Sequence, residues 1–292
     1  INAKSYKEIV FTKNTTEGLN LLVNTYGRKN LKNGDIVVIS EMEHHSNIVP
    51  WLILQKEVGF EIRYIPVNEN FDLEIEWLEN LVREEGGRVM IVSVVHISNV
   101  LGTLNPVKKI AEIGNRVGAF VIVDGAQSAP HIHIDVKDID CDAFVFSGHK
   151  IYGPTGSGVM YCKENILETL PPYMGGGEMI MSVSKNGFEM NDLPWRFEAG
   201  TPDIESGIVL GETLEWFQSV VDEMGGYEVL ISHERELMGT LLDAFDGIEW
   251  FKPFGKTDAD NRYGCLTFNL EGFSSKGCKE KRIENKEGDG IV

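Results

Sequence analysis

The chain has 292 residues, of which 42% are hydrophobic and 25% are charged, and these values are typical of a globular protein with a sizeable core. Its 27 basic and 45 acidic residues give a formal net charge of −18. This balance argues against nucleic acid and against an anionic membrane surface as partners, because both require a basic surface. No apolar run approaches the ~18 residues of a membrane span, so we expect no transmembrane segment.

The four cysteines, Cys141, Cys162, Cys265 and Cys278, lie far apart and form no C-x-x-C pair. We therefore expect neither a disulfide framework nor a metal site, and a reducing, cytoplasmic location fits this usage. The sequence begins with INAKSYKEIVF, without an initiator Met or a signal peptide, and it ends with GDGIV. We expect a fragment cut at both ends.

Short apolar runs alternate with helical patterns through the first two thirds of the chain. The predicted order is strand 8–11, helix 16–26, strand 36–40, helix 47–59, strand 61–67, helix 75–84, strand 89–95, helix 107–117, and strands 120–124, 143–147 and 158–162. The strands are rich in Val and Ile without strict alternation, which is typical of strands buried on both faces. The pattern predicts an α/β fold with a mostly parallel sheet covered by helices on both faces.

The pattern changes after Pro202, where two long helices are predicted at 204–224 and 227–245. Strands are predicted near 248–251 and 266–270. We therefore expect a large ligand-binding domain over residues 1–205 and part of a smaller α+β domain over residues 206–292.

Ligands of parallel sheets gather beyond the carboxyl ends of the strands, so the residues that follow each strand are candidates for a site. After the first strand, Thr15 and Thr16 open a helix, and their hydroxyls with the first backbone N–H groups could bind a phosphate. The alternative is an ordinary helix cap. After the second strand, His44 could stack on a flat ring, although a loop histidine that only forms hydrogen bonds is the commoner case.

The strands predicted at 89–95 and 120–124 are followed by or end in groups that could bind a heterocycle. Asn99 could donate a hydrogen bond to a ring oxygen, or it could be a turn residue. Asp124 ends an apolar strand, where a carboxylate is partly desolvated and favours a cationic partner such as a protonated ring nitrogen. The alternative for Asp124 is a cap on the following turn.

Lys150 follows the strand at 143–147 in the segment SGHK. A charged amine beside a buried strand is costly unless it is paired, solvated or used chemically, and a desolvated lysine can condense with a carbonyl group. The alternative is a lysine paired with an acid. The loop GPTGSG at 153–158 lacks the G-K-[ST] of a nucleotide-binding loop and precedes a strand, so it is interpreted as a turn.

Together these strand ends supply phosphate donors, a flat stacking group, an oxygen donor, a carboxylate and an amine. Pyridoxal 5′-phosphate requires this combination, because its aldehyde needs a lysine and its pyridinium needs an acid. The set therefore predicts a pyridoxal phosphate site, in which Lys150 carries the aldehyde.

The sequence resembles the class V aminotransferase family of fold-type I pyridoxal phosphate enzymes, and within it the SUF-type cysteine desulfurases, also called selenocysteine lyases. The likeness runs from near residue 5 to about residue 272. The stretches that carry it are TTEG (15–18), MEHHSNIVPW (42–51), HISNVLGT (96–103), VDGAQS (123–128), DCDAFVFSGHKIYGPTG (140–156), MGGGEMI (174–180) and PWRFEAGTP (194–202).

The resemblance implies roles for individual residues. Lys150 is expected to be the Schiff-base lysine, Asp124 to pair with the pyridine nitrogen, and His44 to stack on the ring as a second catalytic residue. Gln127 and Asn99 would contact the ring oxygen region. The phosphate would be held by Thr15, Thr16, Ser147 and His149, and by Thr201 of the other subunit of an isologous homodimer.

The implied reaction converts L-cysteine, or alternatively L-selenocysteine, into L-alanine and leaves an enzyme persulfide that passes to an acceptor protein for iron–sulfur cluster assembly. The family's nucleophilic cysteine lies in a late R-x-G-x-x-C loop that this sequence lacks, and Cys278, in KGCKEKR, is in the wrong context. We therefore expect the parent protein to form the persulfide and this fragment to be incomplete for sulfur transfer.

Two alternatives remain open. Another class V enzyme, such as an aminotransferase, a lyase acting on another amino acid or an epimerase, would use the same Lys150 and Asp124. A non-catalytic scaffold of the same fold would bind a sulfur-transfer partner without using the cofactor.

Overall fold

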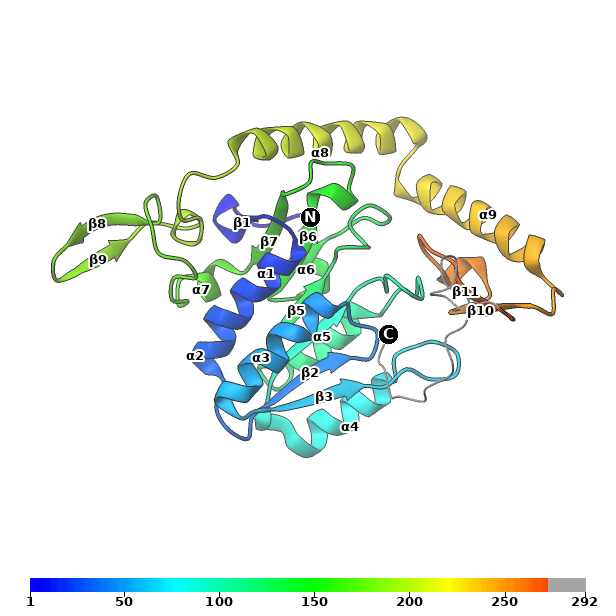
Figure 1. Ribbon diagram of the computed structural model, residues 1–292, viewed down its shortest axis with the longest axis horizontal. Coiled ribbons are helices and arrows are strands. Elements are labelled where there is room, and N and C mark those ends of the chain that lie inside the picture. The colour runs from blue at the N-terminus through cyan, green and yellow to red at the C-terminus, as the bar shows by residue number, and fades with distance from the viewer. Residues whose placement is uncertain (273–292) are drawn as a thin grey trace.

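The central feature of the protein is a seven-stranded mixed sheet with the strand order β1-β7-β6-β5-β4-β2-β3. It is seen in a computed structural model that describes residues 1–272 (Figure 1). The strands are β1 (Ile9–Thr12), β2 (Ile36–Ser40), β3 (Glu61–Ile65), β4 (Val89–Val95), β5 (Phe120–Asp124), β6 (Ala143–Ser147) and β7 (Gly158–Cys162).

Strand direction makes this sheet mostly parallel. β3, β2, β4, β5 and β6 pair in parallel, whereas β7 runs antiparallel to both β6 and β1. β1 therefore points the same way as the parallel strands. The carboxyl ends of β1, β6, β5, β4 and β2 lie at one edge of the sheet, and the expected fold class is confirmed.

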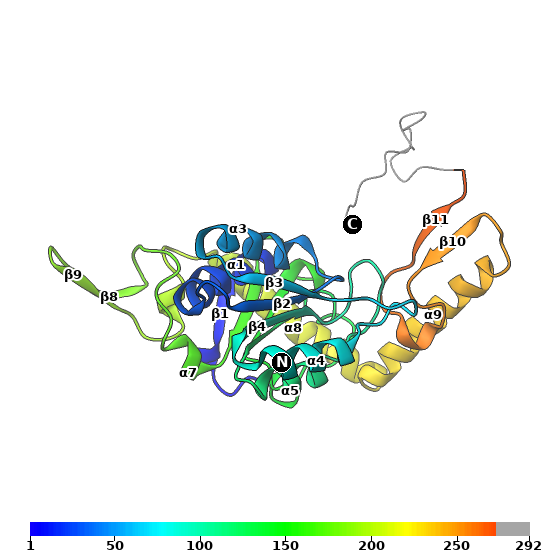
Figure 2. The ribbon, with the colours of Figure 1, turned by 90° about the horizontal axis from the view of Figure 1, so that it is seen from below.

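The two faces of the sheet carry two apolar cores because successive side chains of a strand point to opposite faces. In β2, for example, Ile36 and Val38 belong to one core and Val37 and Ile39 to the other. One core includes residues of α1 (Thr15–Leu22), α3 (Val49–Val58) and α7 (Glu164–Leu167). The other includes residues of α4 (Ile75–Glu85), α5 (Val107–Asn115), α6 (Val136–Ile139) and α8 (Ile204–Met224). Figure 2 shows α1 and α3 on one side of the sheet and α4 and α5 on the other.

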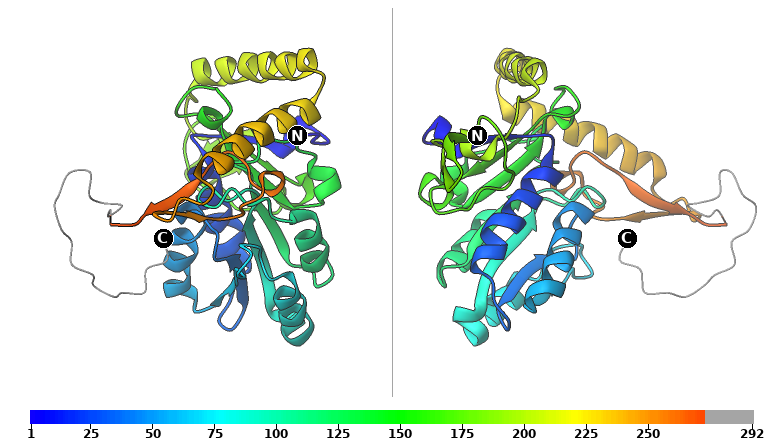
Figure 3. Two further views of the ribbon diagram at one scale, coloured as in Figure 1. Left: turned by 90° about the vertical axis from the view of Figure 1, so that its right-hand side faces the viewer. Right: turned by 60° about the vertical axis from the view of Figure 1, so that its left-hand side comes forward.

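The C-terminal part of the described chain consists of α8, α9 (Tyr227–Phe245) and the antiparallel pair β10 (Phe251–Phe254) and β11 (Thr267–Leu270). α8 runs along the outside of the sheet, and the small β10–β11 sheet lies next to α9 (Figures 1 and 3). The predicted division after residue 205 falls within the first turn of α8 and remains a prediction. Within residues 1–272, no helix is both long enough and apolar enough to cross a membrane.

A hairpin of β8 (Ile180–Ser184) and β9 (Gly187–Met190) projects from the rest of the protein (Figure 1). It was not predicted from the sequence. Its strands are mostly exposed on both faces, so they carry no pattern of burial. The Asn186–Gly187 pair, where the turn meets β9, is the turn signal that could have revealed it.

Two predicted elements differ from the structure in an instructive way. The helix predicted at 16–26 is α-helical only to Leu22 and continues as a π-helical turn, Val23–Gly27, and then as α2 (Arg28–Asn30). A side-chain hydrogen bond to the backbone accompanies this change, because Thr25 Oγ1 donates to the Leu21 carbonyl at 2.7 Å. The strand predicted near 248–251 is wrong, because Gly247 adopts a positive φ of 72° in a turn and β10 starts only at Phe251.

Candidate functional site

A cavity of about 220 Å³ lies at the carboxyl edge of the sheet. Its lining residues come from the segments that follow β1, β2, β4, β5 and β6: Asn14, Thr15, Thr16, His44, Ser46, Val95, Asn99, Asp124, Ala126, Gln127, Ser147, His149 and Lys150. Every predicted site residue except Thr201 is among them. Thr201 is exposed in the loop that precedes α8. The parallel strands thus bring together residues that are far apart in sequence.

Lys150 reaches the cavity from a 3-10 turn, Gly148–Lys150, that directly follows β6. The turn packs tightly against the loop before β7, because the Gly148 N–H donates to the Ser157 carbonyl at 2.8 Å. A Cβ on Gly148 would lie 2.2 Å from Ser157 Oγ, so only glycine fits there. Lys150 is half-buried, and it forms no ion pair with any acid of residues 1–272. The alternative interpretation, a lysine held by a salt bridge, finds no support in the described chain.

Asp124 ends β5 with its side chain only 1% exposed. Its Oδ1 accepts a hydrogen bond from the Ala126 N–H at 2.9 Å. Burial raises the pKa of Asp124 to about 6, against the opposing effects of this hydrogen bond and of the charge on Lys150. A carboxyl group of this kind gains most from a cationic partner, because a positive charge beside it offsets the desolvation of its ionised form.

His44 lies at the cavity in the loop after β2, where its ring is fixed by Ser46. The Ser46 N–H donates to His44 Nδ1 at 3.1 Å, and Ser46 Oγ lies 2.8 Å from the same nitrogen. Nδ1 therefore carries a lone pair, and the proton of the neutral ring is assigned to Nε2. Burial lowers the pKa of His44, as do the nearby charges of Lys150 and His45. His44 thus offers a neutral, flat imidazole to the cavity.

The N-terminus of α1 forms the third wall of the cavity and is tied to the end of β6. The Thr15 N–H donates to Ser147 Oγ at 2.9 Å, and the two hydroxyl oxygens lie 2.8 Å apart. Asn14 caps the helix by accepting from the Glu17 N–H at 3.0 Å. The N–H of Thr16, in the first turn, has no partner within the helix, and Thr16 lines the cavity. This arrangement suits an anion such as phosphate.

Several lining residues were not predicted, and Ser46 is the most informative of them. It follows His44 in the EHHSN segment, where a hydroxyl two residues after a histidine is a recognisable signal for a fixed ring. Glu43, which is buried behind His44, was also missed. A charged residue beside two histidines gave no indication that its side chain points inward.

None of the three cysteines in residues 1–272 lines this cavity, although Cys265 Sγ lies 3.8 Å from the carbonyl oxygen of the lining residue Asn99. Cys162 is buried in β7, as predicted, and Cys141 is buried as well. Burial raises the pKa of both thiols, that of Cys141 to about 12. Cys265 is partly buried, with its Sγ 3.4 Å from the Val100 carbonyl oxygen. Cys278 lies outside the described residues. Among residues 1–272, no cluster of three or more His, Cys, Asp or Glu side chains could hold a metal ion.

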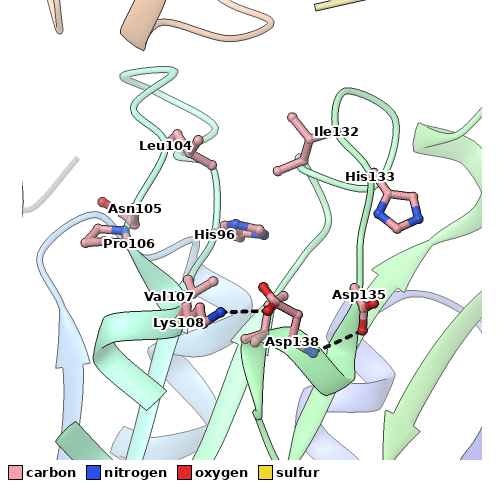
Figure 4. Close-up of a pocket in the computed structure, with 11 residues that line it drawn as sticks. His96, Leu104, Asn105, Pro106, Val107, Lys108, Ile132, His133, Asp135 and Asp138 are labelled. Atoms are coloured by element: carbon pink, nitrogen blue, oxygen red, sulfur yellow. Dashed lines mark hydrogen bonds and ion pairs between the residues drawn. The ribbon is translucent and has the colours of Figure 1, made fainter. Parts of the chain in front are cut away.

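A larger cavity of about 640 Å³ lies between the loop after β4 and the segment around α6 (Figure 4). It contains none of the predicted site residues. Its lysine, Lys108, is paired with Asp138 at 2.6 Å, and the His96 ring extends between the two loops (Figure 4). Because its amine is engaged with an acid, this cavity lacks the combination of groups found in the smaller one.

The fold and the smaller cavity together define an α/β protein with a ligand site beyond the ends of its parallel strands. The family model described as "Aminotransferase class-V" matches residues 1–284, and the chain belongs to this family.

Curated relatives and solved structures agree with this assignment. The chain is 45% identical over 271 residues to a probable cysteine desulfurase of Halalkalibacterium halodurans, covering 93% of this chain and 64% of the relative. It is 44% identical to a cysteine desulfurase of Escherichia coli O7:K1, covering 92% and 64% respectively. The crystal structure of the E. coli cysteine desulfurase CsdA matches with a TM-score of 0.82 at 34% identity, covering 93% of this chain and 65% of that one. The chain therefore spans about 64% of the length of these curated relatives.

Proposed function

We propose that this chain is the cofactor-binding part of a pyridoxal phosphate-dependent cysteine desulfurase. The observation that carries the proposal is that Lys150 and Asp124 face one cavity from neighbouring strands, with no acid of the described chain paired to the lysine. The relatives named cysteine desulfurase support the choice of reaction.

The residues of the cavity fit the proposed cofactor. The buried Asp124 favours a cation, which the protonated ring nitrogen of the cofactor provides. The first turn of α1, with Thr15, Thr16 and the adjoining Ser147 and His149, offers donors suited to the phosphate. His44 would lie against the ring face, and Asn99 and Gln127 near the ring oxygen.

When bound, pyridoxal phosphate supplies an aldehyde that condenses with amines and a ring that withdraws electrons from Cα of an amino acid. Asp124 would keep the ring nitrogen protonated and so strengthen this withdrawal. Lys150 would hold the aldehyde of the cofactor, and its amine would be the group that accepts the Cα proton of the substrate. His44 would orient the ring and exclude water from the face that it covers.

The proposed overall reaction transfers sulfur from L-cysteine to an acceptor thiol. The Cβ–S bond of cysteine breaks and an S–S bond forms, so L-cysteine and a thiol become L-alanine and a persulfide. The proton of the acceptor thiol balances the new C–H bond at Cβ of alanine. Reduction of that carbon matches oxidation of the sulfur, and no further oxidant is required.

The finer assignments are part of the same proposal. The enzyme would act as a homodimer in which Thr201 of one subunit approaches the phosphate of the other. Its persulfide would pass to an acceptor protein of iron–sulfur cluster assembly in the cytoplasm, with L-selenocysteine as an alternative substrate. Residues 1–205 would form the large domain and residues 206–292 part of the small one.

The test is to add pyridoxal phosphate to the purified chain, record the visible absorption, and then supply L-cysteine with an excess of a small thiol. We expect a visible absorption band from the bound cofactor. Where the protein also carries a nucleophilic thiol, we expect L-alanine and sulfide in equal amounts. A band that L-cysteine bleaches, with amino-group transfer to a 2-oxo acid and without sulfide, would favour an aminotransferase. A folded chain that never develops the band would favour the non-catalytic scaffold.

A further inference from the structure

A network of buried polar side chains includes Glu43, the residue that precedes His44. Glu43, Asn47, Ser40 and Ser93 are each at most 5% exposed, and Trp51 is fully buried. They come from β2, the turn after it, α3 and β4. Polar groups this deep destabilise a fold unless every one is paired, so a fully connected set indicates a specific geometry that is being held.

Both oxygens of the Glu43 carboxylate accept hydrogen bonds from neighbouring donors. Oε1 accepts from the Val95 N–H at 2.9 Å and from the Ser40 hydroxyl. Oε2 accepts from Asn47 Nδ2 at 2.7 Å. Burial still raises the pKa of Glu43 to about 7, and the nearby charge of Asp124 adds to this effect. The fold thus keeps a costly carboxylate at this position.

Trp51 determines which way the network is oriented. Its Nε1–H can only donate, and it donates to Asn47 Oδ1 at 3.2 Å, beside the Ser93 hydroxyl that donates to the same atom at 2.7 Å. The amide of Asn47 therefore has to turn its Nδ2 toward Glu43. Glu43 in turn has to present acceptors on both sides, to Asn47 and to Val95.

The geometry points to Glu43 as a positioning residue that fixes the His44 imidazole over the cavity by fastening the loop after β2 to the end of β4. His44 is the next residue in the chain, and Val95, which Glu43 binds, lines the same cavity. The significance of His44 for a ligand rests on the proposed function. The placement of the His44 ring is independent of the proposed function, and it can be measured on the chain without a ligand.

The direct test replaces Glu43→Gln, which keeps the shape but turns one acceptor into a donor facing Asn47 Nδ2. The matched control is Glu8→Gln. Glu8 is also 5% exposed and accepts a backbone N–H, from Lys4 at 2.8 Å, but it precedes the amino end of β1, away from the cavity. Histidine ¹⁵N NMR of the full chain reports the tautomer of His44, whose signal is assigned by its loss in His44→Gln.

We expect the Nε2–H tautomer of His44 in the unchanged chain and in Glu43→Gln a mixture of both tautomers. Binding of pyridoxal phosphate, followed by absorption, should weaken about tenfold in Glu43→Gln and by less than about twofold in Glu8→Gln. The double variant Glu43→Gln with Asn47→Asp reverses donor and acceptor between the two side chains while leaving Trp51 and Val95 satisfied. It should restore both the His44 signal and cofactor affinity.

The outcomes separate the two proposals. If the unchanged chain does not bind pyridoxal phosphate, the proposed function fails, while the NMR measurement still decides the role of Glu43. An unaltered His44 signal in Glu43→Gln, or a double variant that restores nothing, overturns the positioning role. A shifted tautomer with unchanged affinity would support the positioning role of Glu43 and would count against the part that the proposed function gives to the His44 ring.

If Glu43→Gln unfolds the chain, Ser93→Ala provides a second, milder test. It removes one donor to Asn47 and leaves Glu43 and Trp51 in place. We expect a smaller change of the His44 signal in the same direction, and an unaltered signal would contradict the inference.

Discussion

The two edges of the central sheet both carry acidic residues, but they treat them in opposite ways. At the amino edge, Glu61 at the start of β3 is paired with Arg63 and Arg88 in half-exposed ion pairs. Hydrogen bonds from these arginines lower the pKa of Glu61. At the carboxyl edge, Asp124 and Glu43 are buried and have raised pKa values.

The difference distinguishes acids in surface ion pairs from buried acids that serve a functional site. Exposed ion pairs contribute little to stability because water screens them, so the fold loses little stability when one is removed. Buried acids with raised pKa values destabilise the folded chain at neutral pH, so their presence beside a cavity and a lysine indicates a functional site.

The largest effect is expected from Lys150→Ala. Removing the amine should abolish the visible absorption that pyridoxal phosphate produces with the unchanged chain, since no other lysine lines the cavity within the described residues. The control is Lys163→Ala at the amino edge, where Lys163 pairs with Asp140 and Asp142 at 2.9 Å. An unchanged spectrum in Lys150→Ala, or equal loss in both variants, would contradict the assignment.

Asp124→Asn should weaken pyridoxal phosphate binding by about 10-fold to 100-fold, because a neutral amide cannot hold a protonated ring nitrogen as a carboxylate does. Equilibrium titration followed by absorption measures the change. The corresponding amino-edge variant is Asp142→Asn, which removes a carboxylate that accepts from the Val121 N–H at 2.9 Å. Equal weakening by both variants would mean that Asp124 acts only through the fold.

The pH dependence of stability gives a third contrast. The pKa of Asp124 rises from its ordinary value of 3.8 to about 6 on folding. Its contribution to the stability of the folded chain is therefore fully present below pH 3.8 and is lost as pH rises through about 6. The corresponding cost at neutral pH is on the order of 3 kcal/mol for this buried group. Between pH 4 and 7, the free energy of unfolding of the unchanged, cofactor-free chain, measured with urea, should therefore fall by more than that of the Asp124→Asn variant. Parallel curves would refute the raised pKa.

The smallest effect is expected from Glu61→Gln. Its ion pairs are half-exposed, and cofactor affinity should stay within about twofold of the unchanged chain. Thermal unfolding and the same titration check this. A large loss of affinity would show that the amino edge communicates with the cavity and would remove the contrast between the edges.

Most of the sheet could be predicted from sequence because its strands are continuous apolar runs. β2, β4, β5, β6 and β7 have the predicted bounds. The antiparallel direction of β7 was not predicted, since an apolar run has the same composition in either direction. The hairpin of β8 and β9 was missed because its strands bury neither face.

The candidate site could be predicted to a similar degree, because residues that follow parallel strands converge at one edge whatever the details of packing. Asp124 and Lys150 are such residues. The Glu43 network was beyond this reasoning, since it depends on the direction in which a side chain points inside a loop. Thr201 remains a prediction, because a single chain does not place it against the cavity of another.

The most direct test of the account is to treat the chain with pyridoxal phosphate, reduce it with borohydride, digest it and locate the added mass on the peptides. We predict that the cofactor is attached at Lys150, at one equivalent per chain. Attachment spread over surface lysines, or concentrated at another lysine, would contradict the central claim that this amine is placed at the end of β6 to bind an aldehyde.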